Sequence, residues 1–295
     1  RQWKTTAGIT GTDDMRILPV GAAFGHMVRS TVNNLGFAWH LSWPWMCVII
    51  PVNIAAVIYG FTLEPAPSPA VTGPDDVQLF KFELQGVSGW ADSPRVAVAI
   101  LIAALTLFSF ASIAVSWHRY VLLDEVPRGW ARLRADNTVW RYFGNTLLIT
   151  VLLLIGMIPV MLLASVPMAM GNAGAILSLV IYLAGIIYAI ASFYRLSVKL
   201  PAVALERHDF GLKDAWAATT GNVWRLFGLA ILFFLAAIGA ALLIGGIAYL
   251  LEKTGLSFAL FFGIALQIVF NWIVTIMGVT LLTSLYGFFV EGREF

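Results

Sequence analysis

Charged residues are scarce in this chain. Asp, Glu, Lys and Arg make up only 12% of its 295 residues, whereas 60% are hydrophobic. A soluble domain is typically about a quarter charged and about half apolar. The composition therefore excludes a soluble globular protein. It predicts an all-α integral membrane protein, because several apolar runs are long enough to span a bilayer.

Cysteine is nearly absent as well. Cys47 is the single cysteine, so the chain cannot form an internal disulfide, and no oxidised framework holds the fold. Cys47 falls in an apolar stretch, where we expect it to be an inert packing residue. The net charge of +2 is too small to indicate a nucleic-acid partner.

Ionisable side chains are missing from the interior of six apolar stretches. The predicted spans cover about 43–62, 95–117, 145–168, 173–194, 229–250 and 257–288. Because intramembrane charges usually mark ion-coupled transport, their absence argues against a carboxylate-driven pump. It leaves open a pathway for lipid or neutral solute. The deepest strongly polar side chains are Asn53, Gln267 and Asn271, which we interpret as interhelical hydrogen-bond contacts rather than ligand sites.

Catalytic motifs are also missing. The chain has no Gly-rich phosphate loop, no Gly-x-Ser-x-Gly and no acid pair at catalytic spacing. His26, His40, His118 and His208 fall near one predicted membrane face, but no two share a local His-x-x-His motif. We therefore expect interfacial histidines, no metal, no cofactor and no enzymatic activity.

One motif, Val-Trp-Arg-x-Phe-Gly, occurs twice at an offset of 84 residues, each time directly before an apolar span. Its first copy contains Trp140 and Arg141, and its second contains Trp224 and Arg225. Trp prefers the headgroup layer and Arg pairs with lipid phosphate, so the motif predicts the point at which the chain enters the membrane.

A second recurrence lies at the ends of spans two, four and six, where Ser-x-[His/Tyr] places His118, Tyr194 and Tyr286 at matching points. The pattern predicts three parallel repeats, each made of an amphipathic interfacial helix and a helical hairpin. The first interfacial helix is expected at about 24–35, and another at 212–227. The predicted divisions are a polar tail (1–16), repeat 1 (17–119) with an extracytoplasmic loop (63–94), repeat 2 (120–195) and repeat 3 (196–295).

The basic residues are distributed unevenly. Fifteen of the 18 Lys and Arg residues fall on the face shared by both termini and the two charged connections. By the positive-inside rule, both termini are expected in the cytoplasm. On this face, the residues beside the Trp-Arg motifs are Arg128, Arg132, Arg134, Arg207 and Lys213. They are expected either to recognise anionic lipid or only to fix topology and anchor the chain.

The stretch from Arg195 to Glu206, followed by Ala215-Trp216 and by 221–225, resembles a known family. It is similar to the membrane domain appended to some bacterial glycerophosphoryl diester phosphodiesterases and to stand-alone multi-pass relatives of unknown function. The soluble phosphodiesterase barrel of those enzymes is absent from this sequence, so no catalytic residue carries over. The resemblance implies a bacterial inner-membrane location and a six-helix architecture.

Three functions remain open from the sequence. The leading hypothesis is a non-enzymatic scaffold, accessory or assembly component that contacts membrane lipids, a membrane-protein partner or another copy of itself. The second is a translocator or binder of lipid or hydrophobic solute, suggested by the repeated hairpins and the basic face. The third is a His-dependent membrane metalloenzyme, which the lack of ligand spacing disfavours.

Overall fold

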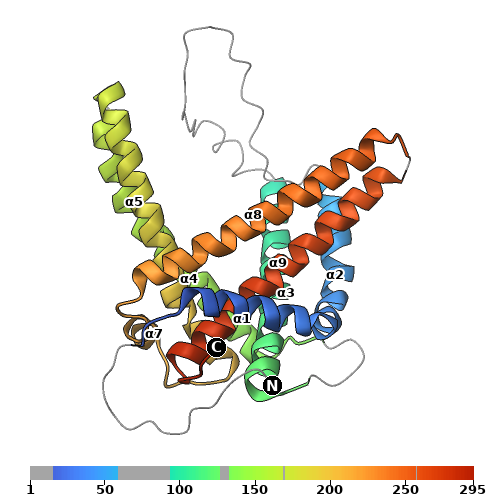
Figure 1. The fold of residues 1–295 in the computed structure, drawn as a ribbon, viewed down its shortest axis with the longest axis horizontal. Helices are drawn as coiled ribbons and strands as arrows, with labels where there is room; N and C mark the ends of the chain where they lie inside the picture. The colour runs from blue at the N-terminus through green and yellow to red at the C-terminus, as the bar shows by residue number, and fades with distance from the viewer. Residues whose placement is uncertain (1–15, 59–93, 127–132, 169, 257) are drawn as a thin grey trace. The chain divides into compact units, whose positions relative to one another are not determined.

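The computed structural model describes residues 16–58, 94–126, 133–168, 170–256 and 258–295. This part of the chain is helical, and Figure 1 shows its order from the blue N-terminal helix to the red C-terminal one. The elements are α1 (Val20–Asn33), α2 (Leu35–Ile58), α3 (Pro94–Leu123), α4 (Asn137–Met168), α5 (Asn172–Ser197), α6 (Lys199–Ala204), α7 (Leu212–Ala218), α8 (Val223–Lys253) and α9 (Ala259–Phe289).

Six of these helices, α2, α3, α4, α5, α8 and α9, are long and apolar enough to cross a membrane. They correspond one to one with the six predicted spans. The prediction of an all-helical fold with six apolar helices of membrane-spanning length is therefore confirmed for the described residues. The predicted loop at 63–94 and the tail at 1–16 lie almost entirely outside those residues.

The helices that carry the Trp-Arg motifs begin earlier than the predicted spans. α4 starts at Asn137 instead of about 145, and α8 starts at Val223 instead of about 229. The motif is therefore the first turns of the span helix itself. Its Trp, Arg and Phe side chains are compatible with a helix, so no break separates the polar start from the apolar continuation.

The interfacial helices match their predictions unequally. α1 is a separate helix that begins at Val20, somewhat before the expected start, and ends before Asn34. The stretch expected as a helix at 212–227 is broken between α7 and α8, where Gly221 takes φ 79°. Glycine adopts this left-handed conformation without steric cost, so it can end one helix and start the next. Before α4, the described residues 124–126 and 133–136 form no helix.

The fold divides into two compact units. One contains the chain up to Leu41 and from Ala111 onward, and the other contains Ser42–Phe110. In the second unit, the rings of Trp45 and Phe108 meet edge to face with centroids 6.0 Å apart. The contacts described below lie within the first unit, apart from the hydrogen bond between Asn53 and Ile49, which lies within the second.

The hydrophobic core of the first unit lies at one end of its long helices, and we call this region the base. There α1 packs against α8 and α9, and α5, α6 and α7 complete the contacts (Figure 1). Its buried side chains come from widely separated parts of the chain: Leu18, Ala23, Met27, Leu122, Val198, Ala202, Ala215, Leu226, Leu229, Leu281, Leu285, Tyr286 and Phe288.

Beyond the base, the two hairpins of this unit separate. α4 pairs with α5 and α8 pairs with α9, and Figure 1 shows the two pairs running away from the base in different directions. The buried residues of α8 are confined to its first turns, at Leu226, Leu229 and Ala230. The outer halves of these helices expose large apolar side chains, as expected for surfaces that contact lipid or other helices.

The α4–α5 pair is held close by a glycine. A Cβ atom added at Gly185 would collide with the side chain of Val160 across the pair. We expect Gly185→Ala to lower the free energy of unfolding by about 1–3 kcal/mol, because the β-branched Val160 cannot swing away. Chemical unfolding in mild detergent measures the change. Gly156→Ala in α4 is the matched control, since a Cβ there meets nothing within 4 Å. Equal losses for both variants would contradict this packing.

Candidate functional site

A chain of hydrogen bonds inside the base joins three of the long helices. His118 of α3 is fully buried and lies between Thr283 of α9, 2.8 Å from Nδ1, and Tyr142 of α4, 3.2 Å from Nε2. The Thr283 hydroxyl donates its proton to the carbonyl of Val279, so it can only accept from His118. Nδ1 of His118 therefore carries a proton. Because the fully buried ring disfavours a charge, we assign His118 as neutral, and the Tyr142 hydroxyl then donates to its Nε2. The three side chains form one continuous donor–acceptor chain.

Two residues of α1 use neighbouring positions of α9 in the same manner. His26 Nδ1 lies 3.0 Å from the Ser284 hydroxyl, and Thr31 donates to Thr280 over 3.0 Å. Ser284 and Thr280 both donate to carbonyls of their own helix, so they act as acceptors toward α1. The last turns of α9 thus accept hydrogen bonds from both α1 and α3. This surface is the polar centre of the base.

The burial of His26 makes the stability of the fold depend on pH. Burial, and secondarily the charge of Arg29, lower the pKa of His26 to about 4 from the ordinary 6.5. Because the pKa of His26 is lower in the folded state than in the unfolded state, protonation favours unfolding. The free energy of unfolding is therefore highest above pH 6.5 and decreases as pH falls toward 4. We expect a loss of about 3 kcal/mol across this window. Unfolding measured against pH for the native chain and His26→Asn should differ in slope there, and parallel curves would contradict the assignment.

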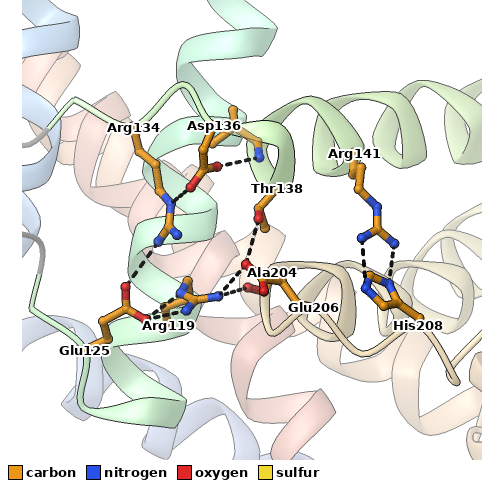
Figure 2. A network of polar contacts seen from close by, with 10 residues as sticks. Arg119, Glu125, Arg134, Asp136, Thr138, Arg141, Ala204, Glu206 and His208 are labelled. Atoms are coloured by element: carbon orange, nitrogen blue, oxygen red, sulfur yellow. Dashed lines mark hydrogen bonds and ion pairs between the residues drawn. The ribbon is translucent and has the colours of Figure 1, made fainter.

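The first Trp-Arg motif binds the connection between α6 and α7. Thr138 donates to a carboxylate oxygen of Glu206 over 2.9 Å, and the Arg141 guanidinium lies 2.7 Å from His208 (Figure 2). Glu206 has φ 60°, in the left-handed region that favours glycine. A non-glycine residue adopts this backbone conformation only when surrounding contacts stabilise it, so the contacts of Glu206 hold its backbone in a strained conformation.

The second Trp-Arg motif makes the equivalent contacts with the segment before α1. Asn222, which matches Thr138 in the repeat, donates to the carbonyl of Arg16 and accepts from the backbone N–H of Leu18, both over 2.8 Å. Arg225, which matches Arg141, donates to the Leu18 carbonyl over 3.2 Å. The first copy therefore binds positions 206 and 208, before α7, and the second binds positions 16 and 18, before α1. In each case the two positions are separated by one residue.

The tryptophans of the two motifs also match. Trp140 packs edge to face on Phe143 at 5.9 Å and 79°, and Trp224 packs on Phe227 at 6.3 Å and 82°. Both indoles lie on the surface, 57% and 72% exposed. The two copies thus present the same aromatic pair at the start of a span helix, as an interfacial anchor would.

Arg119 connects the end of α3 to two loops. Its guanidinium pairs with Glu125 at 2.6 Å and with Glu206 at 3.2 Å, and it donates to the carbonyl of Ala204 at the end of α6. Arg134 pairs with Glu125 at 3.5 Å and with Asp136 at 2.6 Å. Figure 2 shows this charged network beside the contacts of Thr138 and Arg141. Its cations are matched by neighbouring carboxylates, so the arrangement braces the loops against one another.

The remaining predicted basic residues have separate environments. Arg207 donates to Asp209 and to the Tyr286 hydroxyl, over 3.0 and 3.1 Å. The Asp209 contact raises the pKa of Arg207 and lowers that of Asp209, so both stay ionised. Lys213 is exposed on α7. Arg128 and Arg132 lie outside the described residues.

The three intramembrane amides bond within their own helices. Asn53 donates to the carbonyl of Ile49, and Gln267 donates to Asn271 over 3.3 Å, all three side chains being exposed. The interhelical bonds expected for them do not occur among the described residues. The sequence alone cannot distinguish an amide that bonds within its own helix from one that bonds to a neighbouring helix, because both types lie among apolar residues.

The histidines do not share a site. His118 and His26 are buried in the base, His40 bonds to the carbonyl of Gly36, and His208 contacts Arg141. The expectation of interfacial histidines is therefore wrong for His26 and His118. Their burial follows from the hydroxyl-lined surface of α9, which provides partners inside the core. In the part of the chain that the structure describes, no cluster of His, Cys, Asp or Glu could hold a metal ion.

Sequence reasoning missed several residues of the base. Thr138 and Asn222 each stand directly before a copy of the Val-Trp-Arg-x-Phe-Gly motif, at aligned positions, so the repeat itself pointed to them. Thr283 adjoins the third Ser-x-[His/Tyr] ending, but nothing in the sequence pairs it with His118. With this geometry in view, no protein-family model, curated protein or solved structure matches the chain.

Proposed function

We propose that the chain consists of three tandem repeats that close on one another at the base. The matched contacts of the two Trp-Arg motifs support this proposal, since each pair, Thr138 with Arg141 and Asn222 with Arg225, binds the segment before another short helix. In the first repeat, which lacks the motif, Asn34 instead accepts a hydrogen bond from Tyr120.

In our proposal the protein lies in a bacterial inner membrane with the base and both termini in the cytoplasm. The uneven distribution of Lys and Arg supports this orientation, and the resemblance noted for residues 195–206 supports the bacterial inner-membrane location. Trp140, Trp224 and Lys213 would then lie at the cytoplasmic headgroups, where anionic lipid favours them. Most other arginines of the base would brace the fold instead of holding lipid.

The proposed role is that of a non-enzymatic scaffold whose hairpins bind other membrane components. One observation carries it: the α4–α5 pair is well packed internally and at the base, yet its outer faces expose a broad apolar surface. On this surface lie Leu154, Leu162, Leu163, Ile176, Leu179, Val180 and Leu183. A hairpin anchored at one end and open along its length can accept partner helices without disturbing the base.

Site-specific photo-crosslinking in native membranes tests this role. A photoreactive residue is placed at Leu179 or Leu162, which are 56% and 63% exposed on the hairpin. The control is the same residue at Leu123, which is 51% exposed at the base. We expect the hairpin positions, and not the control, to give discrete protein adducts of reproducible mass.

Adducts with lipid alone at both hairpin positions would contradict the scaffold role. They would favour the second candidate, a binder or translocator of lipid, for which the same exposed apolar faces offer contact. Mass spectrometry of the lipid adducts would then show whether one lipid class is enriched over bulk membrane. Enrichment of one class would indicate a lipid-handling function.

A further inference from the structure

Helix α9 carries a polar stripe in the middle of a membrane-spanning helix. Gln267, Asn271 and Thr275 are each four residues apart and therefore share one face, and all three are exposed. Gln267 donates to the side-chain oxygen of Asn271 over 3.3 Å. The Thr275 hydroxyl donates to the backbone carbonyl of Asn271 over 2.8 Å. Gly278 continues the same face, and a Cβ added there meets nothing within 4 Å. We call this face the amide stripe.

These contacts leave much of the amides' hydrogen-bonding capacity unused. Among the described residues, the Asn271 Nδ2 group and the Gln267 Oε1 atom form no hydrogen bond to another helix. Asn271 lies twelve residues into α9 (Ala259–Phe289), so at 1.5 Å per residue it stands about 18 Å along the helix. At such depth the acyl chains offer neither donor nor acceptor, and exposed amides favour association with another polar helix surface.

We infer that the amide stripe is the contact surface for a second copy of this chain. An amide is both donor and acceptor, so the stripe can satisfy an identical stripe, as a twofold interface requires. Two copies inserted with the same topology meet with α9 parallel, and Asn271 then faces its counterpart. One Asn271 donates to Oδ1 of the other, while Gly278 lets the backbones approach.

The inference deepens the proposed scaffold role, because it names one partner, a second copy, and one surface for it. It differs from that role in what it requires. Self-association through α9 needs no other protein, whereas the scaffold role rests on partners bound by the α4–α5 hairpin. The two can therefore fail separately.

Disulfide trapping of the full-length chain in membranes tests the contact. In a Cys47→Ser background, Asn271→Cys places a thiol on the amide stripe. The matched control is Val269→Cys, because Val269 is 43% exposed on the nearly opposite face of the same helix. After mild oxidation, we expect a covalent dimer for Asn271→Cys at several times the yield of the control. Equal yields would show random collision and overturn the inference.

A second measurement removes the hydrogen bonds instead of trapping them. The double variant Gln267→Leu with Asn271→Leu should raise the dimer dissociation constant in liposomes by about tenfold or more. Single-molecule photobleaching of the labelled chain at decreasing protein-to-lipid ratio measures this constant. Asn53→Leu, which makes the same type of change at an exposed amide of α2, should leave the dissociation constant unchanged.

Two results would overturn the inference here. An unchanged dissociation constant in the double variant would show that the amides do not drive association. A loss of monomer stability, measured by unfolding of the dilute protein, would show that the stripe serves packing within one chain. The expected result is an intact monomer that dimerises weakly.

Discussion

His118→Ala is expected to lower the free energy of unfolding by about 3–5 kcal/mol, the largest effect that we expect of a single side chain. The imidazole is fully buried, so its removal leaves a cavity in the base. It also strands the Tyr142 hydroxyl, whose proton has His118 Nε2 as its acceptor. Because the chain of hydrogen bonds joins α3, α4 and α9, the loss should weaken all three contacts together.

Chemical unfolding in mild detergent measures this loss. His40→Ala is the matched control, since His40 is exposed and bonds only to the carbonyl of Gly36 in the same helix, and its loss should stay within about 0.5 kcal/mol. Tyr142→Phe should fall between the two, at about 1–3 kcal/mol, because it removes the donor without opening a cavity. Equal stability of His118→Ala and His40→Ala would contradict a structural role for the buried chain.

Asn222→Ala is expected to have the second-largest effect, about 2–4 kcal/mol. Asn222 is buried, and its amide satisfies both the N–H of the fully buried Leu18 and the carbonyl of Arg16. Alanine would leave both backbone groups without these partners. The segment before α1 should then detach, so limited proteolysis should cut near Arg16 much faster in the variant than in the native chain.

The equivalent residue of the other motif provides the comparison. Thr138→Val should lower the free energy of unfolding by only about 1 kcal/mol, because the Glu206 carboxylate is half exposed and keeps its ion pair with Arg119. Faster proteolysis near Arg16 should not occur in this variant. If Thr138→Val were as costly as Asn222→Ala, or exposed the same segment, the assigned contacts of the two motifs would be wrong.

The sequence predicted the long helices well. Their apolar runs are long and uninterrupted by charge, so the positions of α2, α3, α4, α5, α8 and α9 follow from hydropathy alone. Helix ends were less predictable, since polar first turns such as those around Trp140 and Trp224 do not stand out from a preceding loop. Hydropathy identifies what can lie in hydrocarbon and not where a helix begins.

The candidate site was less accessible from the sequence. Arg141 and Arg225 were expected to reach lipid phosphate, and no feature of the sequence indicated the protein contacts that they make with His208 and the Leu18 carbonyl. A guanidinium can donate to a phosphate, a carbonyl or a ring nitrogen, so its protein partner depends on which loop folds beside it. The buried position of His118 likewise depends on Thr283, which is 165 residues away in the sequence.

Cysteine accessibility tests the proposed topology most directly. In a Cys47→Ser chain, Trp140→Cys, Trp224→Cys and Thr254→Cys are each treated with a membrane-impermeant maleimide in right-side-out and inside-out vesicles. Thr254 follows α8 in the turn that precedes α9. We expect both tryptophan positions to react only from the cytoplasmic side and Thr254 only from the opposite side. Reaction of positions 140 and 224 from opposite sides would contradict the shared base and the three-repeat arrangement built on it.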